Sequence, residues 1–146
     1  MYRALIAELI QNHNWAKLQK PCTENEIAAA EKDVGYPFPE ELKALLRETN
    51  GDHWFLLSAA EISERVRLNR EILAEAFDDI EMFLEKVDRH IFFATNGCGD
   101  YYGYRVLPDG NVDTTAIYMW EHETFDHKIV AKDIPNLITK YYHNEI

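Results

Sequence analysis

Two short stretches hold the residue types best suited to chemistry, and the first is "NGCGD" at 96–100. It places two glycines, a thiol and a carboxylate within five positions. A phosphate-binding loop needs Gly-x-x-x-x-Gly-Lys-Ser/Thr, or Gly-x-Gly-x-x-Gly at the start of a helix. Here Gly97 and Gly99 precede tyrosines typical of a strand, which lacks the free N–H groups and positive dipole of a helix start. The stretch therefore predicts a hairpin turn, in which Asn-Gly supplies positive φ angles.

The same stretch contains Cys98, one of two cysteines in the chain. A nucleophilic cysteine needs a base, usually histidine, and a lowered thiol pKa. We leave open a Cys98–His122–Asp113 set, because His122 lies close to a predicted neighbouring strand. The strand pattern does not fix whether these side chains converge, and no helix start follows Cys98. A small residue in a turn is therefore the favoured interpretation, and an enzyme using Cys98 or His122 is an alternative.

The second stretch, "WEHETFDH", contains His122 and His127. Zinc proteases use His-Glu-x-x-His, which places two imidazoles one helical turn apart. The gap here is one residue too long, and the segment has the pattern of a strand and a loop. We therefore predict no metal and no cofactor. His122 is interpreted as a hydrogen-bonding residue whose protonated form is favoured by Glu121, Glu123 and Asp126.

These stretches need a scaffold, and the sequence predicts helices first, then a run of strands, then a closing helix. Capping boxes at Thr23/Glu26 and Ser58/Glu61 start two of the helices, and Asp133 starts the last. Helices are expected within 1–10, 23–35, 39–50, 58–77 and 133–142, and strands at 54–57, 91–95, 101–106, 116–120 and 128–131. This order predicts an α+β fold with a mostly antiparallel sheet packed against helices. No linker or repeat divides the chain, so one domain is expected over 1–146.

Tyrosines and a tryptophan are concentrated on the predicted strands around the turn. Alternation places Tyr102 and Tyr104 on one face of the sheet and Tyr101 on the other. One face should be core, and the other is expected to expose aromatic rings beside acids, as protein interfaces do. The alternative is that the rings only complete the core. The candidate protein-binding residues are Asp100, Tyr101, Trp120, Glu121 and His122.

The net charge of −11, from 26 acids and 15 bases, restricts the partners. Nucleic acids and anionic membranes are bound through Lys and Arg, so direct binding to either is disfavoured. A basic protein partner is compatible with this charge, and so is an acidic composition that serves solubility alone. No apolar run is long enough to span a bilayer, and the first eight residues lack the apolar core of a signal peptide, so a cytoplasmic location is expected.

Several motifs occur in an order that resembles a known family. They are "EIAAAEKDVGYPFPEELKALLRETNG" at 26–51, then "FFATNGCGDYYGY", "IYMWEHE" and "DIPNLITKYY". The ordered set, from about residue 23 to 142, resembles the SUKH superfamily of SMI/KNR-type domains.

The resemblance implies an α+β binding protein rather than an enzyme. Bacterial members are similar to immunity proteins that bind and neutralise polymorphic toxins, whereas yeast members are regulatory scaffolds in cell-wall signalling. The length of this chain fits the bacterial type, so we expect an immunity protein, with a scaffold as the alternative. By motif position, Asp100 and His122 are the residues of interest. The resemblance carries no catalytic set and leaves the toxin and the oligomeric state open.

Overall fold

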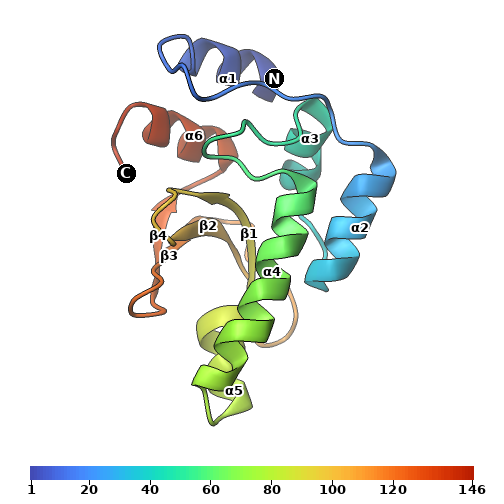
Figure 1. Cartoon of the computed structure of the whole chain (residues 1–146), viewed down its shortest axis with the longest axis vertical. Helices are drawn as coiled ribbons and strands as arrows, with labels where there is room; N and C mark the ends of the chain where they lie inside the picture. Colours follow the sequence, from blue (N-terminus) through green and yellow to red (C-terminus); the bar gives the residue numbers. More distant parts are fainter.

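The computed structural model describes residues 1–146, and it contains six α-helices and one four-stranded sheet (Figure 1). The α-helices are α1 (Tyr2–Leu9), α2 (Glu24–Val34), α3 (Glu40–Glu48), α4 (Ala59–Leu73), α5 (Ile80–Phe83) and α6 (Ile134–Tyr142). A 3₁₀ turn, η1 (Ala74–Ala76), extends α4, and a π-helical turn, η2 (Leu84–Asp88), extends α5. The strands are β1 (His90–Thr95), β2 (Tyr101–Arg105), β3 (Ile117–Trp120) and β4 (His127–Ala131).

The helix starts are those that the sequence predicts. The Thr23 hydroxyl accepts a hydrogen bond from Glu26 N, and the Glu26 carboxylate accepts one from Thr23 N. Ser58 and Glu61 form the same reciprocal pair at the start of α4. At the other end of α2, Gly35 adopts φ 84°, a left-handed cap that costs glycine little. These local signals fix where α2 and α4 begin, and the two helices pack against each other.

The sheet has the order β1-β2-β3-β4, and every neighbouring pair is antiparallel. The predicted α+β class with an antiparallel sheet is therefore confirmed. The predicted strand at 54–57 is wrong in extent, because only a single bridge joins Leu56 to Ala94. The reason is local: the Asp52 carboxylate accepts the backbone N–H groups of residues 54–56, which are then not free to form a ladder.

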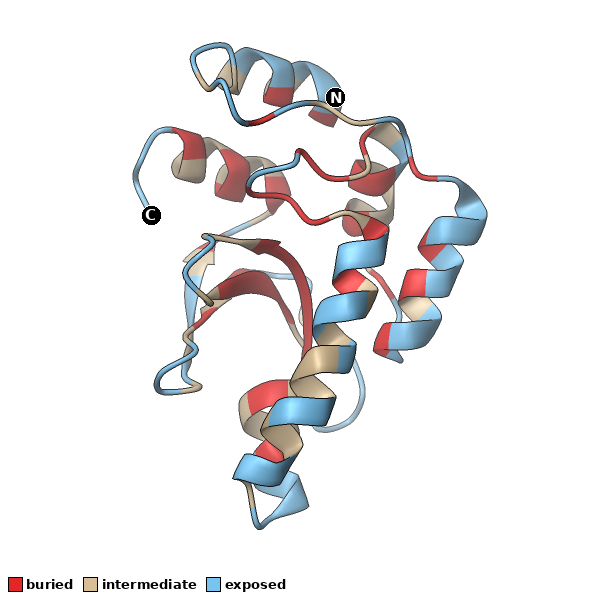
Figure 2. Ribbon diagram, viewed as in Figure 1, coloured by how far each residue is buried: buried red, intermediate tan, exposed pale blue.

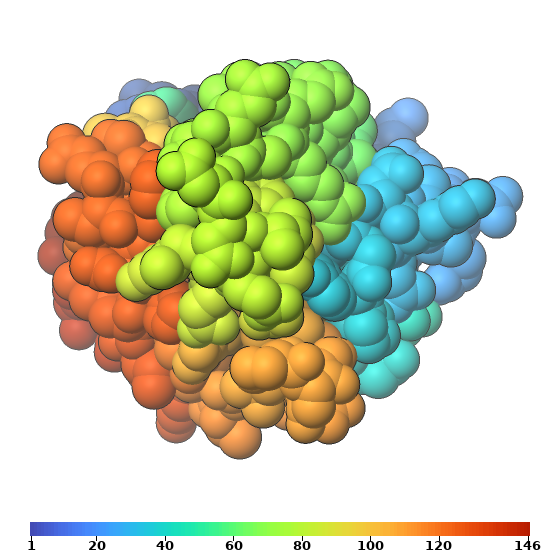
Figure 3. Space-filling model, turned by 90° about the horizontal axis from the view of Figure 1, so that it is seen from below, coloured from blue at the N-terminus to red at the C-terminus, as the bar shows by residue number.

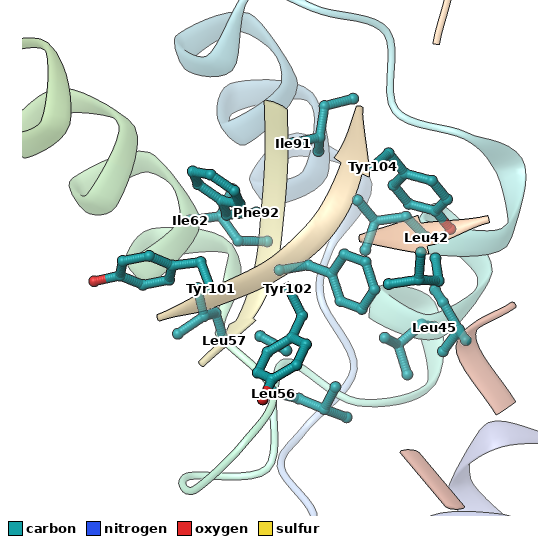
Figure 4. Close-up of a cluster of buried hydrophobic side chains, with 14 of the residues drawn as sticks. Leu42, Leu45, Leu56, Leu57, Ile62, Ile91, Phe92, Tyr101, Tyr102 and Tyr104 are labelled. Carbon is teal, nitrogen blue, oxygen red and sulfur yellow. The ribbon is translucent and has the colours of Figure 1, made fainter. Parts of the chain in front are cut away.

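Both faces of the sheet are covered at β1 and β2, whose residues are almost all buried, whereas β3 and β4 are partly exposed (Figure 2). Tyr102 and Tyr104 point toward α3, whereas Tyr101 and Phe92 point to the other side, toward Ile62 of α4 (Figure 4). The side chain of Tyr101 is only 7% exposed, so the expectation that this face leaves its aromatic rings in solvent is wrong. Alternation along a strand predicts which residues share a face, but it cannot predict that a helix covers each face.

The two ends of the molecule differ. The helix α1, α6 and both chain termini lie at the upper end in Figure 1, whereas α5 and the β3–β4 loop lie at the lower end. Helix α4 runs down one side and connects the two ends. None of the helices combines the length and the apolar character that crossing a bilayer would require.

Candidate functional site

A groove of about 310 Å³ lies beside the C-terminal half of α4. Five α4 residues between 65 and 73 form one wall, and three of them are apolar: Leu68, Ile72 and Leu73. The opposite wall comes from the sheet and its loops and consists of Gly99, Tyr101, Trp120, His122 and Phe125. The groove therefore has mainly aromatic and aliphatic walls, with polar side chains at Arg65, Asn69 and His122 and the hydroxyl group of Tyr101.

Three of the five residues predicted for binding, Tyr101, Trp120 and His122, line this groove. Two of them differ from the expectation, because Tyr101 and Trp120 are buried. The Trp120 indole, 2% exposed, donates a hydrogen bond of 2.7 Å from Nε1 to Lys86 O. These rings therefore form the fixed floor of the groove. They do not project as anchors toward a partner.

Asp100 ties the β1–β2 turn to the start of the β3–β4 loop. Its Oδ1 accepts hydrogen bonds from His122 N at 3.1 Å and from His122 Nδ1 at 2.8 Å. Its Oδ2 accepts one from Asn96 Nδ2 at 3.0 Å. Burial acts to raise the pKa of Asp100, but the hydrogen bonds from His122 and Asn96 outweigh it and lower the pKa below its usual value. Asp100 is therefore a positioning residue for His122 and not a free surface carboxylate.

His122 stands at the edge of the groove with a raised pKa. The hydrogen bond to Asp100 is the main cause, and the charges of Asp100, Glu123 and Glu121 add to it. The direction is the one expected from the neighbouring acids, but Asp100 is the principal partner and Asp126 is not among the causes. The ring rests on Gly99, where φ is +94° and an added Cβ would lie 3.1 Å from His122 Cγ. A glycine is needed here both for the backbone angle and for the close approach.

Glu121, the fifth predicted residue, closes the β3–β4 loop. Its backbone N–H donates to Asp126 O, and its carbonyl oxygen accepts a hydrogen bond from Phe125 N. The carboxylate accepts a hydrogen bond of 3.3 Å from the Thr124 hydroxyl. Glu121 lies next to the groove without lining it, and it holds Phe125 in place on the groove wall.

Arg65 is a groove residue that sequence reasoning missed. Its Cζ lies 5.7 Å from the centroid of the Tyr101 ring, which is within the range of a cation–π contact. Every other arginine of the chain makes a hydrogen bond or an ion pair, as the contacts at residues 3, 47, 67, 70, 89 and 105 show. Arg65 makes neither. The available signal was its helical spacing of four and seven residues from Asn69 and Ile72, which places all three on one side of α4.

The catalytic alternative that the sequence left open is not assembled. Asp113 accepts hydrogen bonds from Thr115 N and from the Tyr118 hydroxyl, each at 2.9 Å, and makes none with His122. The imidazole of His122 is bonded to Asp100 instead. The side chain of Cys98 is exposed in the turn. The Cys98–His122–Asp113 set is therefore wrong as a triad.

The two histidines of "WEHETFDH" also turn to different partners. His127 Nδ1 lies 3.4 Å from Nε2 of the buried His90, whereas His122 bonds to Asp100. No cluster of three or more His, Cys, Asp or Glu side chains has an arrangement that could hold a metal ion.

Next to the groove, residues 72–82 form a surface that we call the acidic lobe. Its exposed apolar side chains are Ile72, Ile80 and Met82. Its exposed acids are Glu75, Asp78, Asp79 and Glu81. Phe125 of the groove wall contacts the lobe, since its ring centroid lies 5.4 Å from that of Phe77. Figure 3 views the molecule from this end and shows α4, η1 and α5 in green between the orange β3–β4 region and the blue α2.

The fold and the site together define a small α+β protein with a sheet covered on both faces and a groove that opens beside α4. The chain belongs to the SMI1 / KNR4 family (SUKH-1), whose family model matches residues 21–140. The resemblance predicted from the motifs over about 23–142 is therefore confirmed. Comparison with curated proteins finds no match for this chain. The matched segment contains the groove and the acidic lobe and leaves out α1.

Proposed function

We propose that this protein is a non-catalytic binding module that acts as an immunity protein, neutralising a toxin by docking onto it. Membership of the SMI1 / KNR4 family (SUKH-1) supports a binding role. The observation that carries the proposal is the groove with its adjoining acidic lobe. Ile72 is 64% exposed there, beside an apolar floor and a set of exposed carboxylates. Exposed apolar groups with a polar rim mark interaction sites on protein surfaces.

Charge determines the kind of toxin surface that fits. The net charge of −11 favours encounter with a basic surface, and the acidic lobe adds a local concentration of carboxylates. Complementary fields raise the association rate and disfavour partners of the same sign. A toxin that acts on an anionic substrate such as a nucleic acid has a basic active-site surface. Docking of the acidic lobe onto that surface excludes the substrate, and no chemical step by this chain is needed.

The negative charge of the chain also argues against nucleic acids and anionic membranes as direct partners. An acidic chain without an extended basic surface repels nucleic-acid phosphates and anionic lipid headgroups, so neither is a direct ligand. The protein would act in the cytoplasm of the cell that makes it, where it meets the toxin before the toxin reaches its target.

The test uses the toxin domain encoded beside the gene and two matched charge reversals. Glu75→Lys with Asp78→Lys alters the acidic lobe, whereas Glu8→Lys with Glu145→Lys makes the same change in charge near the termini. Association measured by surface plasmon resonance at low salt should slow by roughly tenfold in the lobe variant, and the difference should shrink as salt is added. The control pair should stay near the parent rate. Equal rates for the two variants would rule out the acidic lobe as the interface.

One observation favours a second role, as a regulatory scaffold. Trp15 and Trp54 are both exposed and their ring centroids lie 5.2 Å apart, beside His13, whose ring packs against Tyr142 of α6. Exposed tryptophans are frequent anchors of protein interfaces, and an immunity protein with one partner does not need a second such surface. The scaffold role predicts that Trp15→Ala with Trp54→Ala changes growth in cells that lack the toxin. The immunity role predicts no effect there.

A further inference from the structure

The centre of the groove has the opposite charge to its surroundings. Arg65 stands on one wall and His122 on the other, whereas the adjoining lobe carries carboxylates. Arg65 is exposed, and its guanidinium makes no ion pair in a chain with 26 acids and 15 bases. A guanidinium has five N–H donors in a fork that matches a carboxylate. The groove thus presents an unused carboxylate-binding group above an apolar floor.

The geometry keeps this group in place. The contact with the Tyr101 ring, 5.7 Å from Cζ to centroid, holds the guanidinium over the floor of the groove. Tyr101 is itself fixed, because its ring packs against Phe92 and Trp120 with centroids 5.3 and 6.1 Å away. His122 is held from the other side by Asp100 and Gly99. A cationic group on a rigid wall loses little conformational freedom when it binds, which favours recognition at this site.

The apolar part of the groove accepts a side chain beside the carboxylate. Leu68, Ile72 and Phe125 line the space next to Arg65, and the volume of about 310 Å³ is at the small end for ligand pockets. It fits one aromatic or large aliphatic side chain. A lysine or arginine of a partner is disfavoured at the centre by the like charge of Arg65.

We propose that the groove binds an apolar side chain of the partner together with an adjacent carboxylate, which pairs with Arg65. This inference rests on the proposed function and adds the chemistry of the contact. The toxin segment that enters the groove carries an acidic residue next to an aromatic or large aliphatic one, and basic residues of the toxin surround it and face the acidic lobe. The charge pattern of the groove and the acidic lobe thus favours a basic surface that contains one acidic residue at its centre over a uniformly basic surface.

A titration with three small probes tests the groove without the toxin. The probes are 3-phenylpropionate, 3-phenylpropan-1-ol and 3-phenylpropylammonium, which share a phenyl ring and differ in the charge of the head group. The three indole N–H signals in ¹⁵N NMR spectra report on two sites, because Trp120 lines the groove and Trp15 and Trp54 lie together elsewhere. We expect the Trp120 signal to shift with the anion first, the alcohol second and the ammonium last, with the other two signals unmoved. An equal response to the three probes, or shifts at Trp15 and Trp54 instead, overturns the inference.

Matched arginine variants separate this inference from the proposed function. Arg65→Gln should abolish the preference for 3-phenylpropionate over the alcohol, while Arg67→Gln, two residues along α4 and paired with Glu71, should keep it. Toxin affinity should fall at least roughly tenfold in Arg65→Gln and stay near the parent value in Arg67→Gln. If the toxin binds through the acidic lobe but Arg65→Gln costs nothing, the carboxylate contact is wrong and the immunity role stands. If the toxin does not bind at all, the probe titration still decides the chemistry of the groove.

Discussion

Two turns of this protein begin with the same Asn-Gly sequence but differ in the burial of the aspartate that follows. Each begins with Asn-Gly, at 50–51 and at 96–97, and the glycine has φ +79° in both. An aspartate follows in each turn and accepts several hydrogen bonds. Asp52 is fully buried and accepts bonds from three backbone N–H groups and from the Tyr142 hydroxyl. Asp100 lies near the surface, and its main partner is the exposed His122.

The segment that follows each aspartate determines whether its turn is buried in the core or stays near the surface. After Asp52 the chain continues into the apolar segment "WFLL", which drives the turn and its carboxylate into the core. After Asp100 the chain enters β2, and the turn stays at the end of the sheet. The fully buried Asp52 therefore stabilises the fold, and the partly buried Asp100 positions His122 at the groove. Four changes test this division, from the largest expected effect to the smallest.

Removal of the buried carboxylate should have the largest effect. Asp52→Ala leaves three backbone N–H groups and the Tyr142 hydroxyl without an acceptor inside the core. The free energy of unfolding should fall by about 3 kcal/mol or more, measured by urea denaturation. Asp78→Ala, at an exposed position, is the matched control and should change it by less than about 0.5 kcal/mol. Similar losses in the two variants would contradict the structural role of Asp52.

Lowering the pH should reduce the stability of the protein through the buried His90, which the fold holds in its neutral form. Burial lowers the pKa of His90 to about 4, because desolvation disfavours its charged form. The unfolded chain then binds more protons than the folded one between the ordinary pKa of 6.5 and about 4. Stability should therefore fall by about 3 kcal/mol as the pH decreases through this window. The charges around His90 are those of His127, Arg105 and Glu85.

The control for this prediction is His90→Gln, which cannot gain a proton. Its free energy of unfolding should depend less steeply on pH between 6.5 and 4 than that of the parent protein. Carboxylates that titrate in the same range affect the parent and the variant alike, so the difference in slope isolates His90. Parallel pH curves would show that His90 is not held in its neutral form.

Asp100→Asn should have a smaller effect on stability and a clear effect on His122. The loss of the charged hydrogen-bond acceptor should cost about 1 kcal/mol in the free energy of unfolding. The pKa of His122 should fall toward its usual value, because the hydrogen bond that its ring donates to Asp100 is the first cause of its increase. The folded-state pKa of His122 is raised and that of Asp100 is lowered, so the stabilisation from this pair is lost as the pH rises through the pKa of His122 and again as it falls through the pKa of Asp100. An NMR titration of the His122 ring measures the shift, with Glu123→Gln as the control of smaller effect.

The smallest expected effect is a difference between alanine substitutions at Gly97 and Gly99, the two glycines of the β1–β2 turn. Both have positive φ angles, so Gly97→Ala and Gly99→Ala should each cost about 1 kcal/mol through backbone strain. An added Cβ at Gly97 meets nothing within 4 Å, whereas one at Gly99 meets the His122 ring. Only Gly99→Ala should therefore displace the His122 ring signals in NMR spectra. A displacement of equal size in Gly97→Ala would contradict the claim that the His122 ring packs directly on Gly99.

Local features of the fold were predictable because their causes are local. The capping boxes at Thr23 and Ser58 need only residues three positions apart, and both helices begin there. The hairpin at 96–100 follows from its glycines, which join β1 to β2. The ordered motifs predicted the family, because each depends on a short segment with its own turn or cap.

The remaining features depend on residues distant in sequence. The burial of Tyr101 and Trp120 is a consequence of α4 lying over that face of the sheet, which alternation along a strand does not encode. The strand expected at 54–57 did not form, because Asp52 takes its backbone N–H groups. Arg65 was missed because its defining property is the lack of an ion-pair partner, and only the folded arrangement shows that.

The central claim is that the groove and the acidic lobe form the surface that binds the toxin. Ile72 and Ile129 are equally exposed, 64% and 63%, and Ile72 lines the groove whereas Ile129 lies on the edge strand β4. The decisive measurement is the dissociation constant of the toxin complex for Ile72→Asp and Ile129→Asp, which make the same change at the two positions. The account predicts a loss of affinity of about a hundredfold for Ile72→Asp and little change for Ile129→Asp. Full affinity in Ile72→Asp, or the larger loss in Ile129→Asp, would contradict it.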